Sequence, residues 1–267
     1  MTVRVIDVSE FTREIPFSWW QKLREEHNVR GAVIQAWGGG PIAGRQNFYW
    51  AQQSEGARRA FGNGGIASYV WPPRDVGIAL DYMKRESTAL FDLQRFIALD
   101  VEAEAGVSSA NVQTVRHAGQ VPWVYVSPGG WSSIMAGSTS FSHVPLWLAG
   151  YPRRFNRMHW DVPSPAHPHA LIPATIQVGE WHYFPLGGWK NAGGWQFDGT
   201  TPYRNETLDL NVFRDGVFGK GGETVAELDV LKNLMRVAGL FAEASAAALQ
   251  GKPIDTDTKA MLKWLLR

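Results

Sequence analysis

The most informative stretch of the chain reads Phe96-Ile97-Ala98-Leu99-Asp100-Val101-Glu102. Because side chains on a β-strand alternate between its two faces, Ala98, Asp100 and Glu102 share one face and the apolar residues between them share the other. In a barrel of parallel strands, the carboxyl ends of the strands surround the active site. Acids buried there weaken the core but are useful for catalysis. The stretch therefore predicts a barrel strand that carries two carboxyl groups to one end of the sheet.

Short strand-like runs alternate with longer helix-like segments through the first half of the chain. The predicted strands are Val3–Val8, Gly31–Ala36, Ile66–Trp71, Phe96–Glu102 and Pro122–Ser127. The helices predicted between them are Trp19–His27, Ala51–Phe61, Val76–Arg85 and Ser108–Gly119. This alternation is typical of an α/β protein with a parallel sheet.

The pattern changes after Ser127. Further strands are predicted at Pro145–Gly150, Ala174–Val178, Gly194–Phe197 and Leu208–Phe213, without comparable helices between them. The segment Pro152–Asn191 is rich in Pro, Gly, His and aromatic residues, which predicts extended loops with short strands. The second half of the domain is therefore expected to add strands to the sheet rather than helical crossovers.

The C-terminal part has a different composition. A Gly-rich linker at 219–222 precedes an apolar stripe with helical spacing, made of Leu228, Leu231, Met235, Ala238, Ala242, Ser245 and Leu249. A second short helix is predicted over Asp255–Arg267. We expect a catalytic barrel over 1–218 and a small helical module over 223–267. The apolar stripe is covered either by packing on the barrel or by self-association or attachment to a larger assembly.

The composition excludes several classes of protein. The 267 residues are 45% hydrophobic and 19% charged, as in an ordinary soluble globular protein, and the formal net charge of +1 gives no general reason to expect nucleic-acid binding. There is no cysteine, so no disulfide or thiol chemistry is expected. No signal-peptide pattern and no apolar run of about 18 residues is found, so no membrane span is expected. These features predict a protein made in the cytoplasm.

Further acids end other predicted strands. Asp7 shares a face with Val3 and Val5, and Asp209 lies within the apolar run Leu208–Phe213. Neighbouring carboxyl groups raise one another's proton affinity, so that one stays protonated as an acid while another stays ionised, and glycoside hydrolysis needs both roles. Taken singly, each acid could equally cap a turn or pair with an arginine. It is their convergence on one end of a barrel that favours catalysis.

Six short motifs together resemble the family 25 glycoside hydrolases, and they occur in that family's order between Val3 and Phe213. They are Asp7-Val8-Ser9, Gly31-Ala32-Val33-Ile34-Gln35-Ala36, Leu99-Asp100-Val101-Glu102, Pro145-Leu146-Trp147-Leu148-Ala149-Gly150-Tyr151, Trp195-Gln196-Phe197 and Leu208-Asp209-Leu210-Asn211. The resemblance implies a flattened, TIM-like (β/α)5(β)3 barrel. It also implies hydrolysis of the β-1,4 bond between N-acetylmuramic acid and N-acetylglucosamine in bacterial peptidoglycan, as in phage-type lysozymes.

The resemblance also implies roles for the four acids. Glu102 corresponds to the general acid, and Asp100 to the partner that stabilises the charged intermediate or orients the acetamido group of the substrate. Asp7 and Asp209 correspond to supporting carboxylates. Whether Asp100 attacks directly or assists an internal attack by the acetamido oxygen stays open, because the strand spacing does not fix the distance between the two side chains.

Aromatic residues near the predicted strand ends are candidates for a sugar-binding groove. An aromatic face packs well on the apolar face of a pyranose, although ordinary core packing explains about half of such residues. The candidates are Tyr69, Tyr125, Trp147, Tyr151, Trp195 and Trp37. The segment Trp37-Gly38-Gly39-Gly40 departs from the family, which often carries an acid at this place.

Other chemistries have little support in the sequence. The pair His167 and His169 lacks a set of further metal ligands, the Gly-rich segment after Trp37 lacks the Lys and Ser or Thr of a phosphate loop, and no nucleophile elbow is present. No metal or cofactor is therefore expected. The alternatives to a wall lysin, acting after release or within a virion, are an inactive glycan-binding or virion structural protein and a hydrolase of another acetamido-sugar polymer.

Overall fold

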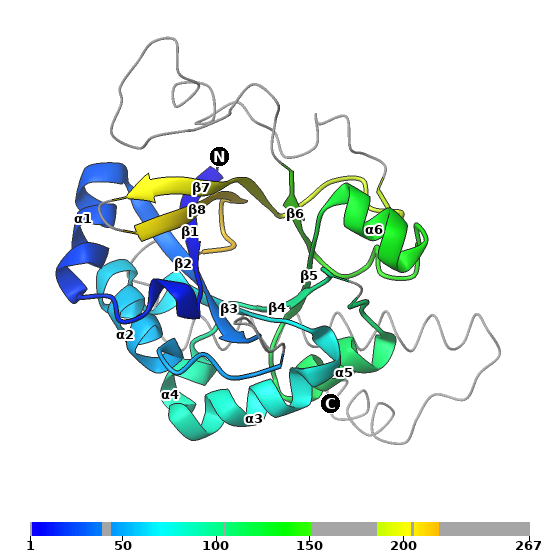
Figure 1. Ribbon diagram of the computed structural model, residues 1–267, viewed down its shortest axis with the longest axis horizontal. Coiled ribbons are helices and arrows are strands. Elements are labelled where there is room, and N and C mark those ends of the chain that lie inside the picture. The colour runs from blue at the N-terminus through cyan, green and yellow to red at the C-terminus, as the bar shows by residue number, and fades with distance from the viewer. Residues whose placement is uncertain (1, 39–43, 104, 151–185, 204–205, 219–267) are drawn as a thin grey trace, which may run out of the picture. The chain divides into compact units, whose positions relative to one another are not determined.

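The computed structural model of the chain describes residues 2–38, 44–103, 105–150, 186–203 and 206–218. These residues form a closed barrel in which the strands follow one another around the ring in the order β1 to β8 (Figure 1). The strands are β1 Thr2–Val8, β2 Val29–Trp37, β3 Ile66–Val70, β4 Ile97–Asp100, β5 Pro122–Val126, β6 Leu146–Ala149, β7 Gly194–Tyr203 and β8 Glu206–Arg214. Each consecutive pair of strands from β1–β2 to β6–β7 is parallel. The last strand, β8, pairs antiparallel with both β7 and β1.

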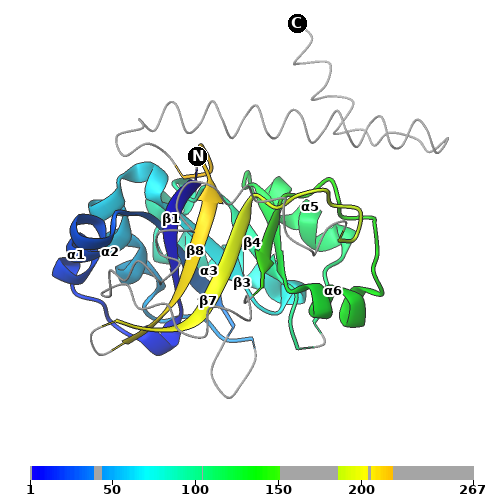
Figure 2. The ribbon, with the colours of Figure 1, turned by 90° about the horizontal axis from the view of Figure 1, so that it is seen from above.

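Helices follow each of the first five strands. They are α1 Phe17–His27, α2 Trp50–Phe61, α3 Val76–Glu86, α4 Thr88–Asp92, α5 Ser109–His117 and α6 Pro128–Met135, with short 3-10 turns at Glu10–Thr12, Asn63–Gly65 and Pro73–Asp75. Seen from above, α1 and α2 flank one side of the barrel and α5 and α6 the other, and no described helix lies over β7 and β8 (Figure 2). The predicted (β/α)5(β)3 barrel is therefore confirmed.

Strand alternation divides the buried side chains into two layers. The outward layer, which includes Ile6 and Ile34, packs against the helices, whereas the inward layer includes Val5 and Val33. At the amino-terminal end of the strands, the barrel is filled by aromatic rings that pack against Phe96, two of them stacked and that of Phe218 edge-on. Their centroids lie 4.5 Å from Phe96 for Trp123, 5.7 Å for Phe213 and 5.8 Å for Phe218. This aromatic floor closes one end of the barrel and leaves polar side chains at the other.

Two parts of the helix and strand prediction need correction. The short helices α4 and α6 were not predicted, and β4 ends at Asp100, so that Glu102 follows the strand rather than belonging to it. The segment Pro128-Gly129-Gly130 has the composition of a turn. However, the Ser127 side chain accepts a hydrogen bond from the Gly130 N–H, and proline is favourable at the first position of a helix. Local capping thus outweighs the low helix propensity of the two glycines.

Several predictions lie outside the described residues. These are the strand Ala174–Val178, most of the loop segment Pro152–Asn191 and the C-terminal module 223–267. Among the helices that are described, none combines the length and apolar character needed to span a membrane.

Candidate active site

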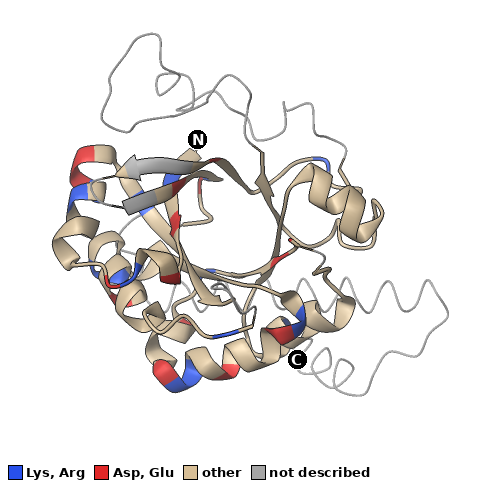
Figure 3. Ribbon diagram, in the orientation of Figure 1, with Lys and Arg blue, Asp and Glu red and all other residues tan. Residues whose placement is uncertain are grey.

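The pairing register places Asp7 and Asp209 side by side at the open end of the barrel. They are direct partners in the antiparallel pair of β1 and β8. Both side chains lie on the inward face, as the alternation of Val5 and Asp7 predicts. In Figure 3, acidic segments lie on several barrel strands, which also carry a few basic segments, whereas many of the other charged segments lie on the surrounding helices. The barrel thus gathers carboxyl groups at its open end.

Asp7 is surrounded by hydrogen-bond donors. Its Oδ2 atom accepts from Asn211 Nδ2 at 2.7 Å and from Gln196 Nε2 at 3.0 Å, and a further hydrogen bond joins it to Asp209. Burial raises the pKa of Asp7 above its ordinary value, and these hydrogen bonds offset part of that rise because they favour the ionised form. Asp7 is therefore the member of the pair that is equipped to carry the negative charge.

Asp209 carries the proton that the pair retains. Burial, followed by the charge of Asp7 and the hydrogen bond to it, raises the pKa of Asp209 to about 10. Gln196 Nε2 also donates to Asp209 Oδ2 at 3.2 Å. Two adjacent carboxyl groups in a dry environment cannot both ionise, and the donors around Asp7 decide which of them does.

Asp100 and Glu102 lie at and just beyond the end of β4. Asp100 is buried, and its Oδ1 atom has no hydrogen-bond partner among the described residues. Burial raises the pKa of Asp100 well above its usual range, with further contributions from the charges of Glu102 and Asp7. Burial also raises the pKa of Glu102, and the charge of Asp7 adds to this, while a hydrogen bond with Tyr125 acts in the opposite direction. The four predicted acids are thus electrostatically coupled across one opening.

Three of the predicted aromatic residues lie inside the barrel with the acids. The pKa of Tyr69 is raised well above its usual value by burial and by the surrounding acids, Asp7 and Asp100 foremost among them. The Trp147 ring lies 4.4 Å from the ring of Tyr125 and 6.2 Å from that of Tyr69, and Trp147 is fully buried. Trp147 therefore supports the site from below rather than offering a face for stacking on a sugar.

The structure does not place the other predicted aromatic residues in the site. Trp195 is only 1% exposed, belongs to the outward layer and donates its indole N–H to the carbonyl of Gly150 at 2.8 Å, so it does not line the site. Trp37 is also in the outward layer, and its indole N–H points to Asp75 Oδ2 at 3.4 Å. Neither tryptophan is brought to the acids. Tyr151 lies outside the described residues.

Three residues at the site were not singled out by the sequence. Gln196 and Asn211 are direct partners in the β7–β8 pair, and both point to Asp7. The signal for Asn211 was present, because it shares a face with Asp209. Trp71 is partly exposed and donates its indole N–H to the backbone carbonyl of Glu102 at 3.2 Å, which ties the β3 loop to the end of β4.

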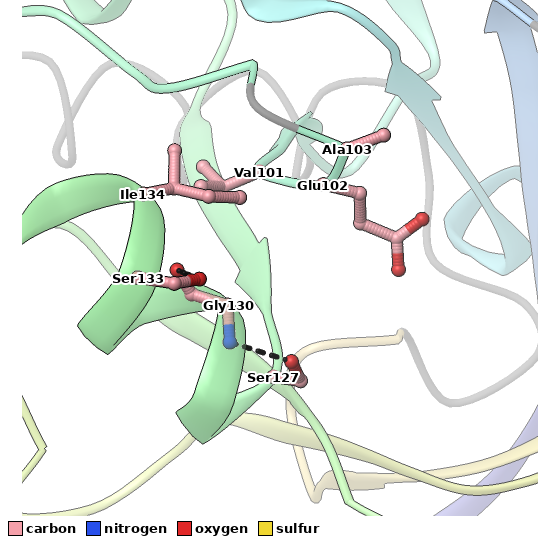
Figure 4. Close-up of a pocket in the computed structure, with 7 residues that line it drawn as sticks. All are labelled: Val101, Glu102, Ala103, Ser127, Gly130, Ser133 and Ile134. Carbon is pink, nitrogen blue, oxygen red and sulfur yellow. Dashed lines mark hydrogen bonds between the residues drawn. The ribbon is translucent and has the colours of Figure 1, made fainter.

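A pocket of about 730 Å³ opens beside Glu102 (Figure 4). Glu102 lies at its edge with the carboxyl group pointing away from α6, while α6 supplies the opposite wall. The lining residues are Val101, Glu102, Ala103, Ser127, Gly130, Ser133 and Ile134. Apart from Glu102, these residues are uncharged, and two of them carry hydroxyl groups that suit a polar, neutral ligand. The site therefore joins a carboxyl group whose pKa is raised by burial to a cavity able to hold an uncharged group.

Comparison with known proteins identifies the fold to which this barrel corresponds. No protein-family model and no curated protein matches the sequence. Among solved structures, a muramidase from Trichobolus zukalii matches with 17% identity and a TM-score of 0.52, over 86% of this chain and 98% of that one. GHIP, a glycosyl hydrolase 25 of Streptococcus pneumoniae, matches with 14% identity and a TM-score of 0.51, over 85% of this chain and 90% of that one.

A third similar structure contains a ligand. The modular autolysin LytC from Streptococcus pneumoniae, in complex with a synthetic peptidoglycan ligand, matches with 16% identity and a TM-score of 0.52, over 80% of this chain and 47% of LytC. At these identities the matches establish the fold. The chain has the barrel of the family 25 glycoside hydrolases, and the resemblance indicated by the sequence motifs is confirmed at that level.

Proposed function

We propose that this chain is an N-acetylmuramidase that cleaves the β-1,4 bond between N-acetylmuramic acid and N-acetylglucosamine in bacterial peptidoglycan. The observation that carries the proposal is the gathering of Asp7, Asp100, Glu102 and Asp209 at the open end of the barrel, where burial raises the pKa of all four carboxyl groups and hydrogen bonds from Asn211 and Gln196 offset part of that rise at Asp7. Hydrolysis of a glycosidic bond requires a proton donor and a stabilising negative charge within one site.

Glu102 is the proposed general acid. It is the acid that lines the pocket, and its side chain extends from the edge of that space with the carboxyl group pointing away from α6 (Figure 4). We expect the glycosidic oxygen to approach the carboxyl group at this edge. Burial and the charge of Asp7 favour its protonated form, which is the form that donates a proton to the leaving sugar. Asp7 is less suited to this step, because its Oδ2 atom is already engaged by two amide groups.

Asp100 is proposed to stabilise the reacting sugar. Its Oδ1 atom is buried without a hydrogen-bond partner among the described residues, and such an atom is costly unless a ligand supplies a donor. The N–H of an acetamido group is a donor of the required kind. A positive charge that develops on the sugar would also favour the ionised form of Asp100, so that its stabilising effect grows toward the transition state.

The proposed substrate agrees with the surroundings of the acids. The pocket beside Glu102 has an uncharged wall with the Ser127 and Ser133 side chains, which suits a sugar with hydroxyl and acetamido groups. LytC, which shares the barrel, is described in complex with a synthetic peptidoglycan ligand. We further propose that the protein is a phage-type wall lysin, which reaches the wall after release from the cell or as part of a virion.

The test is digestion of purified peptidoglycan by the full chain. We expect loss of turbidity together with new reducing ends, and analysis of the released fragments should show N-acetylmuramic acid at those ends. Glu102→Gln, which keeps the shape of the side chain but removes the transferable proton, should reduce the rate by about 10²- to 10⁴-fold. Glu25→Gln, on the exposed surface of α1, is the matched control and should leave the rate unchanged.

Other outcomes would support different functions. Sedimentation of the protein with peptidoglycan without new reducing ends would indicate a glycan-binding protein. Activity on chitin but not on peptidoglycan would indicate a hydrolase of another acetamido-sugar polymer. A Glu102→Gln variant that keeps more than about half of the activity would show that another group is the acid.

A further inference from the structure

Trp71 differs from the other described tryptophans in its exposure. Every other tryptophan in the described part of the chain is at most 8% exposed, whereas Trp71 is partly exposed. Within that part of the chain, its ring contacts neither another aromatic ring nor a cation. A single exposed aromatic residue is common on protein surfaces, so its position decides whether it has a role.

Trp71 lies at the mouth of the barrel beside the acids. Tyr69 faces inward on β3, and Trp71 is the next residue of that alternation. The parallel pairing of β3 and β4 joins Val70 to Leu99, so the residues that follow them, Trp71 and Asp100, come level with each other. The indole therefore extends the inward face of β3 at the height of the acids of β4.

Hydrogen bonds hold Trp71 against the residue that carries the proposed general acid. The indole N–H donates to the backbone carbonyl of Glu102 at 3.2 Å, and the N–H of Ala105 donates to the same carbonyl at 2.9 Å. On its other side, the backbone N–H of Trp71 donates to the carbonyl of Trp37 at 2.9 Å. One edge of the indole is thus tied to the backbone of Glu102.

The end of β2 is shaped to fit Trp71. A Cβ atom at Gly38 would lie 2.2 Å from the carbonyl oxygen of Trp71 and 3.0 Å from its Cβ, and Gly38 has a φ of +103°. Both the close approach and the backbone conformation require glycine at this position. Trp71 is therefore held between the end of β2 and the turn after β4, rather than standing loose on the surface.

Trp71 and the pocket beside Glu102 lie on opposite sides of Glu102. The strands follow one another around the ring, with Trp71 after β3, Glu102 after β4 and α6 after β5. The carboxyl group of Glu102 points away from α6 (Figure 4). A glycan bound across Glu102 would accordingly have one sugar on the side of α6 and the next on the side of Trp71.

The chemistry beside Trp71 suits an acetamido sugar. A β-linked pyranose has an apolar C–H face, and an indole is the largest flat apolar surface that a protein can offer to it. Asp100, at the same height, has a buried Oδ1 atom without a hydrogen-bond partner among the described residues, and an acetamido N–H can supply that partner. A flat apolar surface and a hydrogen-bond acceptor are thus available to the same sugar.

We propose that Trp71 is a sugar-binding residue that stacks on the sugar whose acetamido group reaches Asp100, while the next sugar of the chain occupies the pocket beside Glu102. The choice of an acetamido sugar rests on the proposed function. The indole N–H anchors the ring, and the ring face binds the ligand.

The experiment measures the Kd of a soluble tetrasaccharide of alternating N-acetylglucosamine and N-acetylmuramic acid. The full chain carries Glu102→Gln, which prevents cleavage. In this parent, Trp71→Leu removes both the ring and its anchor and should raise the Kd about tenfold. Trp71→Phe keeps an aromatic face but loses the N–H, and its Kd should stay within about threefold of that of the parent.

A matched control and a second measurement accompany these variants. Phe17 on α1 is also partly exposed, but its ring is covered by the Arg59 guanidinium at 3.9 Å, so Phe17→Leu should not change the Kd. Fluorine-19 NMR of the parent labelled with 5-fluorotryptophan follows Trp71 directly. The Trp71 signal, assigned by its absence in Trp71→Phe, should shift with the sugar and saturate, whereas that of the fully buried Trp50 should not.

Equal losses of affinity in Trp71→Leu and Trp71→Phe would overturn the proposal, because the hydrogen bond to Glu102 would then account for the whole effect. An unchanged Kd in Trp71→Leu, or a Trp71 signal that does not respond to the sugar, would also overturn it. The NMR measurement decides the question even if Trp71→Leu fails to fold. Neither measurement requires cleavage, so a native chain that binds the sugar through Trp71 but cleaves no glycan would refute the proposed function and leave this inference standing.

Discussion

Replacing Asp209 by asparagine should make the protein more stable at neutral pH, although it should damage the site. Asp209 retains its proton because burial and the neighbouring Asp7 raise its pKa to about 10, whereas an aspartate in the unfolded chain has a pKa of about 3.9. Asparagine has nearly the same shape, and its NH2 group can donate to Asp7 as the protonated carboxyl does. The variant therefore keeps the hydrogen bond and removes the group that must bind a proton on folding.

The sign and size follow from the linkage between protonation and folding. Between about pH 4 and pH 10, the folded state holds a proton at Asp209 that the unfolded state has released, so the free energy of unfolding falls by about 1.4 kcal/mol for each pH unit. From pH 5 to pH 8, this group alone contributes a loss of about 4 kcal/mol. Asp209→Asn lacks that dependence. The stability difference between variant and native chain should therefore grow with pH in favour of the variant.

Urea unfolding at half-unit intervals between pH 5 and pH 8 measures the effect. The other acids of the site occur in both proteins, so their contributions largely cancel in the difference. Asp81→Asn, on the exposed surface of α3, makes the same chemical change without burial, and its curve should run parallel to that of the native chain. Parallel curves for Asp209→Asn as well would refute the reasoning, because Asp209 would then be ionised in the folded protein.

Three further outcomes test other parts of the site. Asp7→Asn should reduce activity by at least about 10²-fold and, because the charge of Asp7 raises the pKa of Glu102, should move the alkaline limb of the pH–rate profile to lower pH. Ser133→Trp should fill the pocket beside Glu102 and raise KM about tenfold or more, whereas the exposed neighbour Ser132→Trp, which does not line the pocket, should not. Trp147→Phe should lower the free energy of unfolding by about 1 to 3 kcal/mol in urea titrations, because the Asn211 amide loses its donor.

The inward or outward direction of the acids could be predicted from the sequence because it depends on local geometry. Once Val3–Val8 is a strand, Asp7 must share the face of Val5, whatever lies around it. The same reasoning applies to Asp100 in β4. The parallel order of the strands then brings both acids to one end of the barrel, and the structure agrees.

The environment of the β7 strand could not be predicted in this way. The residues Trp195, Gln196 and Phe197 alternate, but alternation alone does not say which face is inward. The sequence argument favoured Trp195 because indoles suit sugars. The pairing of β7 with β8 instead sets Gln196 opposite Asn211 and turns Trp195 outward. Register between strands is a non-local property, and a single residue of shift reverses every side chain.

The helix α6 is a second element that could not be predicted from the sequence. No helix was expected between Ser127 and the strand Pro145–Gly150, yet α6 forms, and with it the wall of the pocket beside Glu102. The decisive interaction is the cap formed by Ser127, which is visible in the sequence only when a helix is already expected there.

The way in which the acids are held favours an enzyme over a protein that only binds glycans. A sugar-binding groove can form its hydrogen bonds with amides and hydroxyl groups, which do not oppose folding when pH rises. This chain instead buries Asp7 and Asp100 and retains a proton on Asp209 at neutral pH, which reduces its stability. It also positions Gln196 and Asn211 so that Asp7 is the group that ionises. Proton transfer needs acids with defined protonation states, and this arrangement provides them at the expense of stability. Glycan binding alone does not need them.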